Sequence, residues 1–415
     1  MAREYKDSGI EWIGQIPKEW ENARYKFSGC FVKGKLPVNQ NNEKVGLPII
    51  GASEMLGKEC RTFTTDTNVP TCSSNDILIL WDGANAGIVA NKCEGAVSST
   101  AVKYTCTDGR FNRQYLFYLL KNAEPFFKSK VNGTTIPHMN SKYIDDYVCL
   151  LPSLSEQQKI ADYLDKVCGE VDEMVALQET MIEELKAYKQ SVITEAVTKG
   201  LNPDVPMRNS GIDWIGDIPE HWEVRRIGRL FRLRDEKNYK PMEEVQLLSL
   251  YTGIGVFPHG EQEERGNKAV TVEGYKVVHK DDIVVNIILA WMGAIGVSDY
   301  DGVTSPAYDV YIPDFTKVVP HYFHYVFRTK GIAAECYKYG RGIMMMRWRT
   351  YSSEFKQISV PYPSIEEQQQ IASYLDTKCS EIDSLIALKQ AKIEELKEYK
   401  KSVIYEYVTG KKEVC

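Results

Sequence analysis

The sequence predicts an α+β protein in which two mixed α/β modules are separated by an antiparallel pair of long coiled-coil helices, as a pseudo-two-fold internal repeat. Two internal matches and one periodicity predict this arrangement. Residues 8–20 recur as residues 210–222 with 9 of 13 positions identical. Residues 152–198 recur as residues 363–409 with 28 of 47 identical. The longer match carries a coiled-coil heptad pattern, and matches of this kind indicate a duplicated architecture.

The repeat divides the 415 residues into four parts. A lead-in with a first module spans residues 1–150, and a first helix spans 151–200. A second lead-in with a second module spans 201–360, and a second helix spans 361–415. A chain of this length is too long for one core and is expected to form two or three domains. The helices match closely while the modules share only scattered features.

The repeated segments have clear helix signals at both ends. A Ser-x-x-Glu capping box opens each segment, at Ser153 and at Ser364. A glycine, Gly200 or Gly410, stands where each helix is expected to stop. Apolar residues between these ends follow steps of three and four, which predicts a coiled-coil seam. The expected seam residues are Ile160, Leu164, Val167, Val171, Met174, Met181, Leu185, Tyr188 and Val192, then Ile371, Leu375, Ile382, Leu385, Leu396, Tyr399 and Val403.

Chain connectivity predicts the direction of the pair. An amphipathic helix of about 65–70 Å, at ~1.5 Å per residue, is unstable alone, and its own copy is the nearest partner. The second helix begins as soon as the second module ends, so an antiparallel pair forms directly. A parallel pair would need residues 201–222 stretched almost to ~3.4 Å per residue. The antiparallel choice predicts modules in inverted poses. Lys378 and Lys389 fall in the seam, where they either fix the register or pack by their stems.

Each module has one apolar run typical of a buried strand and one short helical pattern. The strands are expected at residues 76–81 and 282–288. The helices are expected at residues 115–120 and 322–327, from the spacing of aromatic residues and leucines. Both modules are therefore expected to be mixed α/β.

Bulk properties point to a cytoplasmic protein with reduced thiols. No apolar run reaches the ~18 residues that a membrane span requires, and the N-terminus lacks the apolar stretch of a secretory signal. None of the ten cysteines falls in a Cys-x-x-Cys pair. Cys168 and Cys379 occupy equivalent places in the two helices, where a small buried side chain is the usual role.

The net charge of −6 is unevenly distributed. The two modules carry +3 (residues 21–150) and +2 (residues 222–360). The helical segments carry −5 and −2, and the two lead-ins together carry the remaining −4. The modules are thus mildly basic, which permits contact with nucleic acid through local patches.

Catalytic motifs are absent from the sequence. It holds no phosphate-binding loop, no dinucleotide fingerprint, no Asn-Pro-Pro-Tyr-type base-methylation motif and no Gly-x-Ser-x-Gly elbow. His321 and His324 could share a helix face, but no third ligand accompanies them, so a packed or solvated pair is favoured over a metal site. We therefore expect no catalytic residue, no cofactor and no metal on this chain.

One loop in each module is rich in groups that can contact DNA. Hydroxyls, amides, Lys and Arg suit contacts with phosphates and base edges, and tryptophan can stack. A plain surface loop explains the first set equally well, and a methionine core beside solvated arginines is the alternative for the second. An offset of 209 places Arg347 where His138 falls. The candidates are Gly133, Thr134, Thr135, His138, Asn140 and Lys142, then Arg341, Arg347, Trp348 and Arg349.

A second pair of segments follows each predicted strand and a glycine-bearing turn. An offset of 206 aligns residues 97–101 with residues 303–307, and the turn after Trp81 is matched with the turn after Trp291. Small hydroxylic residues there let the backbone approach a ligand, although strand packing is slightly favoured. The candidates are Trp81, Asn85, Ser98 and Ser99, then Trp291, Ser305 and Tyr308.

These features together resemble the specificity subunit of type I restriction–modification systems over nearly the whole chain. The most characteristic parts are residues 151–160 and 362–371, which open the repeated helices, with the loop at 133–138 and the two lead-ins. The resemblance implies two target-recognition domains held apart by an antiparallel helical pair. Each domain would read one half of a split, asymmetric DNA site, and the chain itself would not be an enzyme.

The same resemblance implies partners and their cofactors. Two methyltransferase subunits would dock on the helices and modify adenines, and motor–nuclease subunits would join for restriction. S-adenosylmethionine, ATP and magnesium would belong to those partners. The alternative is a protein scaffold that reads no DNA, and a nuclease fragment is the third possibility. The second module departs from the pattern of the first loop, with Arg347 in the place of His138.

Overall fold

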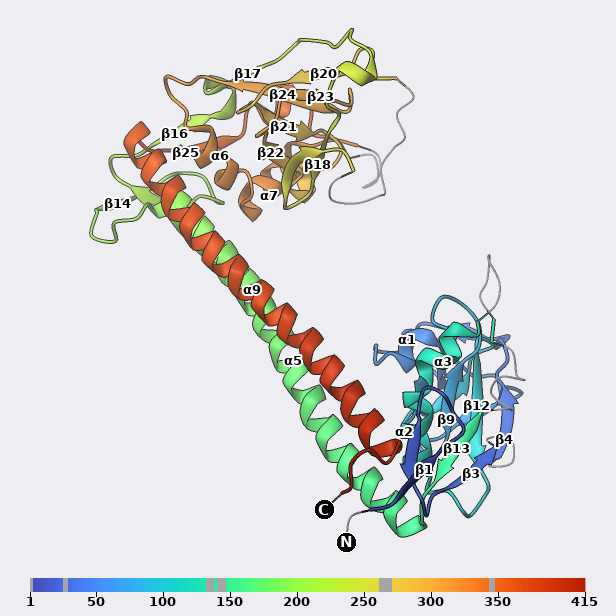
Figure 1. Ribbon diagram of the computed structural model, residues 1–415. Coiled ribbons are helices and arrows are strands. Elements are labelled where there is room, and N and C mark those ends of the chain that lie inside the picture. The colour runs from blue at the N-terminus through green and yellow to red at the C-terminus, as the bar shows by residue number, and fades with distance from the viewer. Residues whose placement is uncertain are drawn as a thin grey trace. The chain divides into compact units, whose positions relative to one another are not determined.

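A computed structural model describes residues 3–24, 29–131, 138–139, 147–260, 271–342 and 348–414. The chain divides into two compact units (Figure 1). The first is Met1–Glu179 with Gln390–Cys415, and the second is Thr180–Lys389. The two longest helices, α5 (Leu154–Lys199) and α9 (Ile365–Val408), therefore each contribute one half to each unit.

The first unit is built around two sheets, one of four strands and one of five. The four-stranded sheet has the order β10-β9-β12-β4 and is antiparallel throughout, and the five-stranded sheet has the order β5-β7-β6-β11-β8. Two-stranded pairs, β1-β2 and β13-β3, complete it. The elements are β1 Tyr5–Asp7, β2 Gln15–Pro17, β3 Glu21–Arg24, β4 Gly29–Lys33, β5 Gln40–Asn41, β6 Leu47–Ile50, α1 Ala52–Met55, β7 Phe63–Thr64, β8 Thr71–Cys72, β9 Ile77–Leu80, β10 Val89–Ala90, β11 Gly95–Val97, β12 Ala101–Cys106, α2 Arg113–Asn122, α3 Glu124–Ser129 and β13 Val148–Leu151.

The second unit repeats the central sheet with different surroundings. Its four-stranded sheet, in the order β17-β24-β21-β22, is again antiparallel. Two-stranded pairs β14-β15, β16-β25, β18-β19 and β20-β23 surround it. The elements are β14 Met207–Asn209, β15 Asp217–Pro219, β16 Glu223–Arg226, η2 Ile227–Arg229, β17 Phe231–Leu233, η3 Met242–Glu244, β18 Leu248–Tyr251, β19 Gly255–Pro258, β20 Lys276–Val278, β21 Ile283–Asn286, η4 Ala290–Met292, β22 Ile295–Val297, β23 Gly302–Thr304, β24 Tyr308–Pro313, α6 Pro320–Val326, α7 Lys330–Tyr339, α8 Ser352–Phe355 and β25 Ser359–Tyr362.

The predicted strands and short helices are confirmed. β9 is buried along its whole length because its two faces meet different cores: Ile77 and Ile79 pack with α2, while Leu78 and Leu80 pack in a second cluster. The same alternation recurs in β21. A strand buried on both faces has no polar side, and this explains its continuous apolar run.

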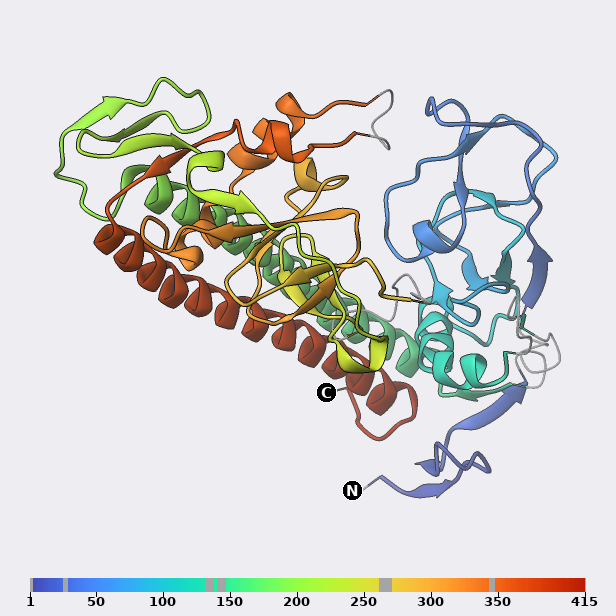
Figure 2. The ribbon, with the colours of Figure 1, turned by 90° about the horizontal axis from the view of Figure 1, so that it is seen from above.

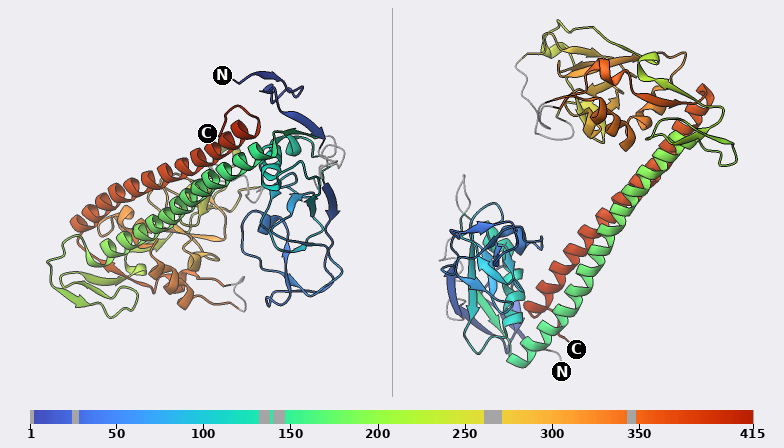
Figure 3. Two further views of the ribbon diagram at one scale, coloured as in Figure 1. Left: turned by 90° about the horizontal axis from the view of Figure 1, so that it is seen from below. Right: turned by 180° about the vertical axis from the view of Figure 1, so that it is seen from behind.

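The antiparallel pairing of the long helices is confirmed within each unit. In the first unit Tyr163 of α5 packs on Tyr407 of α9, and further along α5 Asp172 bonds Lys400, earlier on α9. In the second unit Lys189 of α5 bonds Asp383 of α9. Figures 1 and 3 show α5 (green) and α9 (red) lying side by side.

The predicted seam is only partly right. Ile160, Leu164, Ile371 and Leu375 are buried as expected. Four expected seam residues are instead about half exposed: Met174 (46%), Tyr188 (57%), Leu385 (48%) and Tyr399 (52%). Ile182 and Ile393, which the prediction omitted, are buried in their place.

The reason is that α5 has two apolar stripes. Met174, Leu177, Met181 and Tyr188 recur at heptad spacing, but each residue advances ~100° around the helix, and this stripe lies roughly a quarter turn from the buried line through Val171. α9 repeats both stripes at an offset of 211. A heptad pattern identifies an apolar stripe, and packing decides which stripe faces the other helix.

Each lead-in fastens a module to both long helices of its own unit. In the first unit the indole of Trp20, 1% exposed, donates to Glu156 of α5, and Gly410 after α9 packs on the same ring. In the second unit Trp222 donates to Glu367 of α9, and Gly200 after α5 packs on it. Gly200 and Gly410 have positive φ angles of 77° and 68°, as expected of glycines that end a helix. The hairpin β1-β2 is the dark blue segment in Figure 2.

Cys168 and Cys379 are buried, as the sequence predicted.

Among the helices in the described residues, none combines the length and the apolar character that a membrane span requires.

Candidate nucleic-acid interface

The candidate site of the first module forms where three chain segments meet at the end of β9. The N–H of Trp81 donates to the carbonyl of Thr100 at 2.8 Å, and the N–H of Asp82 donates to the same oxygen at 3.2 Å. The N–H of Met139 donates to the carbonyl of Trp81 at 2.9 Å. This framework brings residues distant in sequence to one strand end, with the half-buried Trp81 at its centre.

A polar cluster stands on this framework. Nδ1 of His138 lies 2.7 Å from the carboxylate of Asp82, and Nζ of Lys33 lies 3.3 Å from its other oxygen. The side chains of His138 and Lys33 are 60% and 54% exposed, whereas Asp82 is only 16% exposed. The carboxylate thus fixes two exposed nitrogen-bearing groups that can donate to phosphate or base edges.

Ser98 forms the turn that leads into β12. Its hydroxyl accepts from the N–H of Thr100 at 3.3 Å, and its carbonyl accepts from the N–H of Ala101 at 3.0 Å. The neighbouring Ser99 is half-buried, and Asn85 is exposed in the turn after β9. The role that the structure gives Ser98 is to shape a turn beside the site.

Six sequence candidates lie outside the described residues: Gly133, Thr134, Thr135, Asn140 and Lys142 of the first module, and Arg347 of the second. Met344–Met346, the alternative core filler, lie outside them too.

The second module has the same framework at the end of β21. The N–H of Ile287 donates to the carbonyl of Ala307 at 3.3 Å, as Trp81 does to Thr100. The N–H of Thr350 donates to the carbonyl of Ile287 at 2.9 Å, as Met139 does to Trp81. Thr350 therefore corresponds to Met139.

This correspondence corrects the offset of 209 expected between the two loops. If Thr350 corresponds to Met139, then Arg349, one residue earlier, is the counterpart of His138, and the offset is 211. The predicted counterpart, Arg347, is two residues away. The modules differ in loop length between strands and helices, and a single offset could not follow these insertions.

The matched serines also shift by one position. Ser305 accepts from the N–H of Ala307 at its hydroxyl (3.4 Å) and from the N–H of Tyr308 at its carbonyl (3.0 Å), repeating the turn at Ser98. Ser305 is thus the counterpart of Ser98, at an offset of 207, and not of Ser99.

The expected match between Trp81 and Trp291 is wrong as well. Trp291 lies in η4, four residues beyond Ile287, which occupies the place of Trp81. Gly87 and Gly293, with φ of 92° and 83°, close the turn after the strand in both modules. Trp291 lies two residues before Gly293, and Asn85 lies two residues before Gly87, so Trp291 corresponds to Asn85.

Three aromatic rings gather beside the second framework. Trp348 stacks on Tyr337 with centroids 5.1 Å apart at 23°, and its indole N–H donates to the carbonyl of Tyr337 at 3.0 Å. Trp291 packs on the same tyrosine at 6.0 Å. Tyr337 is 45% exposed, so part of this aromatic surface is open to a ligand.

Two arginines flank the aromatic rings. Arg341 and Arg349 exchange both backbone hydrogen bonds at 3.0 Å. The guanidinium of Arg341 bonds Glu354 at 2.8 Å and lies 5.4 Å over the ring of Tyr351. The Arg341 side chain is 67% exposed while Glu354 is 16% exposed, so an inner carboxylate holds an outer cation. Held guanidinium groups of this kind suit bidentate contact with guanine or phosphate.

Tyr308 lies inside the framework. It is half-buried and pairs with Asn286 across β24 and β21. Burial raises the pKa of the Tyr308 hydroxyl, and its hydrogen bond with Asn286 acts in the opposite direction. Tyr308 therefore remains a neutral hydroxyl at physiological pH.

Sequence reasoning missed the residues that hold these groups in place. Asp82, Lys33, Tyr337 and Glu354 carry no local motif, and they come from the turn after β9, from β4, from α7 and from α8. Only the turn after the predicted strand, which contains Asp82, gave a usable signal.

The histidine pair of α6 is a packed pair. His321 and His324 stack 5.5 Å apart, and Nε2 of His321 lies 2.8 Å from Asp376. Burial and the nearby charge of Arg328 lower the pKa of His324 to about 3. Across the described residues no group of three His, Cys, Asp or Glu side chains could hold a metal ion.

Comparisons with known proteins agree on one family. The model of the type I restriction modification DNA specificity domain matches twice, at residues 17–187 and 219–398. The MjaVIII specificity subunit of Methanocaldococcus jannaschii is 28% identical over 96% of this chain and 94% of its own length. The EcoBI specificity subunit of Escherichia coli is 24% identical over 83% and 76%.

A solved structure shows the same fold. It comes from work titled "Structural basis underlying complex assembly and conformational transition of the type I R-M system". It covers 95% of this chain and 98% of its own chain, at a TM-score of 0.65 and 14% identity.

Proposed function

This chain belongs to the type I restriction modification DNA specificity family, and from that premise we propose that it is a non-catalytic specificity subunit reading a bipartite, asymmetric DNA sequence. The observation that carries the proposal is the pair of strand-end sites. Both stand on one backbone framework, and each presents different side chains on it.

The difference between the side chains supports two unlike half-sites. The first site presents His138 and Lys33 around a carboxylate, while the second presents Arg341 and Arg349 beside stacked aromatic rings. Base edges in the major groove are read by the donors and acceptors that a side chain offers. Unlike donor sets on a common frame therefore suit unlike half-sites.

The long helices supply a candidate partner surface. The outer stripe is repeated, so that Met174, Leu177 and Tyr188 of α5 match Leu385, Leu388 and Tyr399 of α9. All six side chains are between 46% and 67% exposed. Exposed apolar residues in such rows mark protein contacts, and a repeated row suits two copies of one partner.

We assign this surface to two methyltransferase subunits, with motor–nuclease subunits joining the complex for restriction. S-adenosylmethionine, ATP and magnesium would then be bound by those partners and not by this chain. This chain would contribute only the recognition of the DNA sequence.

Methylome sequencing tests the proposal directly. With the gene intact, adenine methylation should appear at one bipartite motif, and deletion of the gene should abolish it. Exchange of the second module for another should change one half of the motif only.

Salt dependence separates this proposal from a scaffold that reads no DNA. A DNA reader in complex with its methyltransferase should lose affinity for duplex DNA steeply as salt rises, because phosphate contacts release counterions. Binding without such a slope, or an unchanged methylome after deletion, would contradict the proposal.

A further inference from the structure

The positive charge of the second module is concentrated in one short segment. Residues 224–234 hold five arginines and no acidic residue. Residues 222–360 as a whole hold 19 basic and 17 acidic residues, so without this segment they hold 14 and 17 and carry a net charge of −3. A polyanion that binds this module is therefore attracted to one segment and not to the module as a whole.

Two of the five arginines have partners within the protein. The guanidinium of Arg225 bonds Glu223 at 2.8 Å and lies 4.0 Å from the centroid of the Tyr362 ring. The guanidinium of Arg234 bonds the two oxygens of Asp282 at 2.8 and 2.9 Å. Both side chains therefore hold parts of the module together.

The other three, Arg226, Arg229 and Arg232, are exposed, and their side chains have no hydrogen bond or ion pair with any residue that the structure describes. The backbone directs them outward. Side chains alternate along β17, so Phe231 packs in the core while Arg232 lies on the opposite face of the strand. In η2, Ile227 is buried and Arg229 is exposed. The charges of these three arginines are thus open to a ligand.

Arg229 and Arg232 line one hollow of about 340 Å³ beside β17. An acidic residue, Asp314, also stands in its wall. Both oxygens of this carboxylate are engaged, one by Lys317 at 2.6 Å and the other by the hydroxyl of Thr316 at 2.6 Å. The hollow therefore presents two arginines whose charge this carboxylate does not take up.

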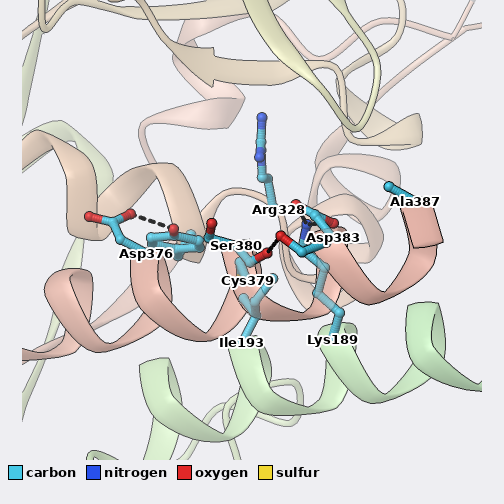
Figure 4. A pocket seen from close by; sticks show the side chains of 10 residues that line it. Lys189, Ile193, Arg328, Asp376, Cys379, Ser380, Asp383 and Ala387 are labelled. Carbon is cyan, nitrogen blue, oxygen red and sulfur yellow. Dashed lines mark hydrogen bonds and ion pairs between the residues drawn. The ribbon is translucent and has the colours of Figure 1, made fainter.

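Another cavity of the second unit, of about 460 Å³ between α5, α6 and α9, has a different balance of charge (Figure 4). Two aspartates line it, and both are engaged. Asp383 is held by Lys189 at 2.7 Å, and Asp376 accepts from Tyr325 at 2.6 Å. An anion is therefore attracted to the hollow beside β17 and not to this cavity.

The exposed arginines adjoin the second candidate site through α8. The N–H of Gly228 donates to the carbonyl of Lys356 at 3.0 Å. The two residues are so close that a Cβ on Gly228 would lie 3.0 Å from the Cβ of Lys356. Lys356 follows Glu354, which holds Arg341 of the candidate site, by only two positions. The segment that carries the arginines therefore borders the site at the end of β21.

We propose that Arg226, Arg229 and Arg232 bind the phosphate backbone of the DNA whose second half-site is read at the end of β21. The inference rests on the proposed function and gives the second module another surface, which holds the duplex without reading its sequence. Guanidinium groups bind phosphate by two parallel N–H···O bonds. Contacts of this kind fix the position and orientation of a protein on the duplex.

Placement and charge favour DNA over an acidic protein partner. The three arginines come from β16, η2 and β17 in turn, which suits the repeated phosphates of a duplex, about one every 3.4 Å along each strand. The helical segments to which we assign the methyltransferase carry net charges of −5 and −2. A partner matched to those segments is basic where it docks, and the arginines would repel it.

The first module does not repeat the three arginines. β4 takes the place of β17, and its pairing puts Cys30 at the position of Arg232. At the same offset of 202, Arg226 is matched by Arg24, whereas Arg229 is not matched by a basic residue. We therefore expect these phosphate contacts beside the second half-site.

The first test is the triple variant Arg226→Gln/Arg229→Gln/Arg232→Gln in the complex of the full chain with its methyltransferase. Its affinity for duplex DNA that contains the methylated motif is measured over a range of salt concentrations. The slope of log affinity against log salt should become shallower by about 2–3, since each phosphate contact contributes about 0.9. Arg229→Gln alone should change the slope by about 1. The methylated motif should be the same as in wild type, because phosphate contacts carry no sequence information.

The matched control is Lys237→Gln/Lys240→Gln/Lys280→Gln. It removes three exposed positive charges from the same module, but two of these lysines share a hollow with Glu236 and Glu244. The control should leave the slope close to that of wild type. An unchanged slope in the arginine variant would overturn the proposal, and so would an equal change in both triple variants, since the effect would then depend on net charge alone.

The affinity of the purified methyltransferase subunit for the variant chain separates DNA from a protein partner. This affinity should equal that of wild type. Weaker methyltransferase binding with an unchanged salt slope would assign the arginines to a protein contact and contradict the proposal. A wild-type complex that methylates a bipartite motif leaves the proposed function standing in either case. If the wild-type complex methylates no bipartite motif, the proposed function itself fails.

Discussion

The ends of β9 and β21 can be compared residue by residue, because the same three backbone–backbone hydrogen bonds shape both. Trp81, Thr100 and Met139 of the first module correspond to Ile287, Ala307 and Thr350 of the second. The side chains placed on this frame share almost nothing. The comparison teaches that the fold conserves positions within hydrogen-bonded backbone and leaves the exposed side chains free to vary. This is what a protein needs if its two modules recognise different sequences.

A buried aspartate precedes each central strand, Asp76 before β9 and Asp282 before β21. Substitution of these two residues should give the largest difference in stability between the modules. Asp282, 2% exposed in its side chain, holds Arg234 by two bonds, while Asp76 accepts from Thr105 and Ser73. Asp282→Asn should destabilise its module by up to about 3–5 kcal/mol, because the guanidinium of Arg234 loses its buried carboxylate and keeps only the exposed Glu236. Asp76→Asn should cost only about 1–2 kcal/mol. Hydrogen exchange of amides in β21 and β9 measures each, and equal losses would contradict the distinction.

The exposed groups should separate the two half-sites. Arg349→Ala should weaken binding by about 1–3 kcal/mol if the guanidinium contacts guanine in two places, and only on duplexes with an intact second half-site. His138→Ala should weaken binding only through the first half-site. Competition between duplexes altered in one half measures both effects. A uniform loss on all duplexes would indicate phosphate contact and remove the residue from base reading.

The smallest expected effect concerns the lead-ins and depends on pH. Burial acts to raise the pKa of Glu367, but hydrogen bonds from Trp222 and His221 outweigh it and lower the pKa below the ordinary 4.5. Because the pKa of Glu367 is lower in the folded protein than in the unfolded chain, its ionised carboxylate stabilises the fold at pH values above 4.5. This stabilisation is lost as the pH falls through the pKa of the folded protein. Glu367→Gln should therefore cost no more than about 1 kcal/mol at neutral pH, since solvent screens a partly exposed group.

Unfolding curves at several pH values measure this difference. The gap between Glu367→Gln and wild type should narrow below pH 4.5. A gap that stays constant down to pH 3 would mean that the carboxylate charge plays no part in holding the lead-in.

The fold could be predicted from the sequence because its signals are long or local. The repeat, the capping serines, the helix-ending glycines and the apolar runs of β9 and β21 all lie within single segments. The candidate site was predicted less well. Trp348 and Arg341 do belong to one cluster, but the partners that hold them, Tyr337 and Glu354, come from α7 and α8.

The sequence by itself determined that this chain is a duplication with two modules and two matched helices. Identity between distant segments, helix caps and hydrophobic periodicity are one-dimensional properties, and the antiparallel direction followed from connectivity. The tertiary structure alone decided which apolar stripe of α5 is buried and which arginine occupies the place of His138. Each of these depends on contacts between segments whose spacing differs in the two halves, and such contacts have no fixed offset along the chain.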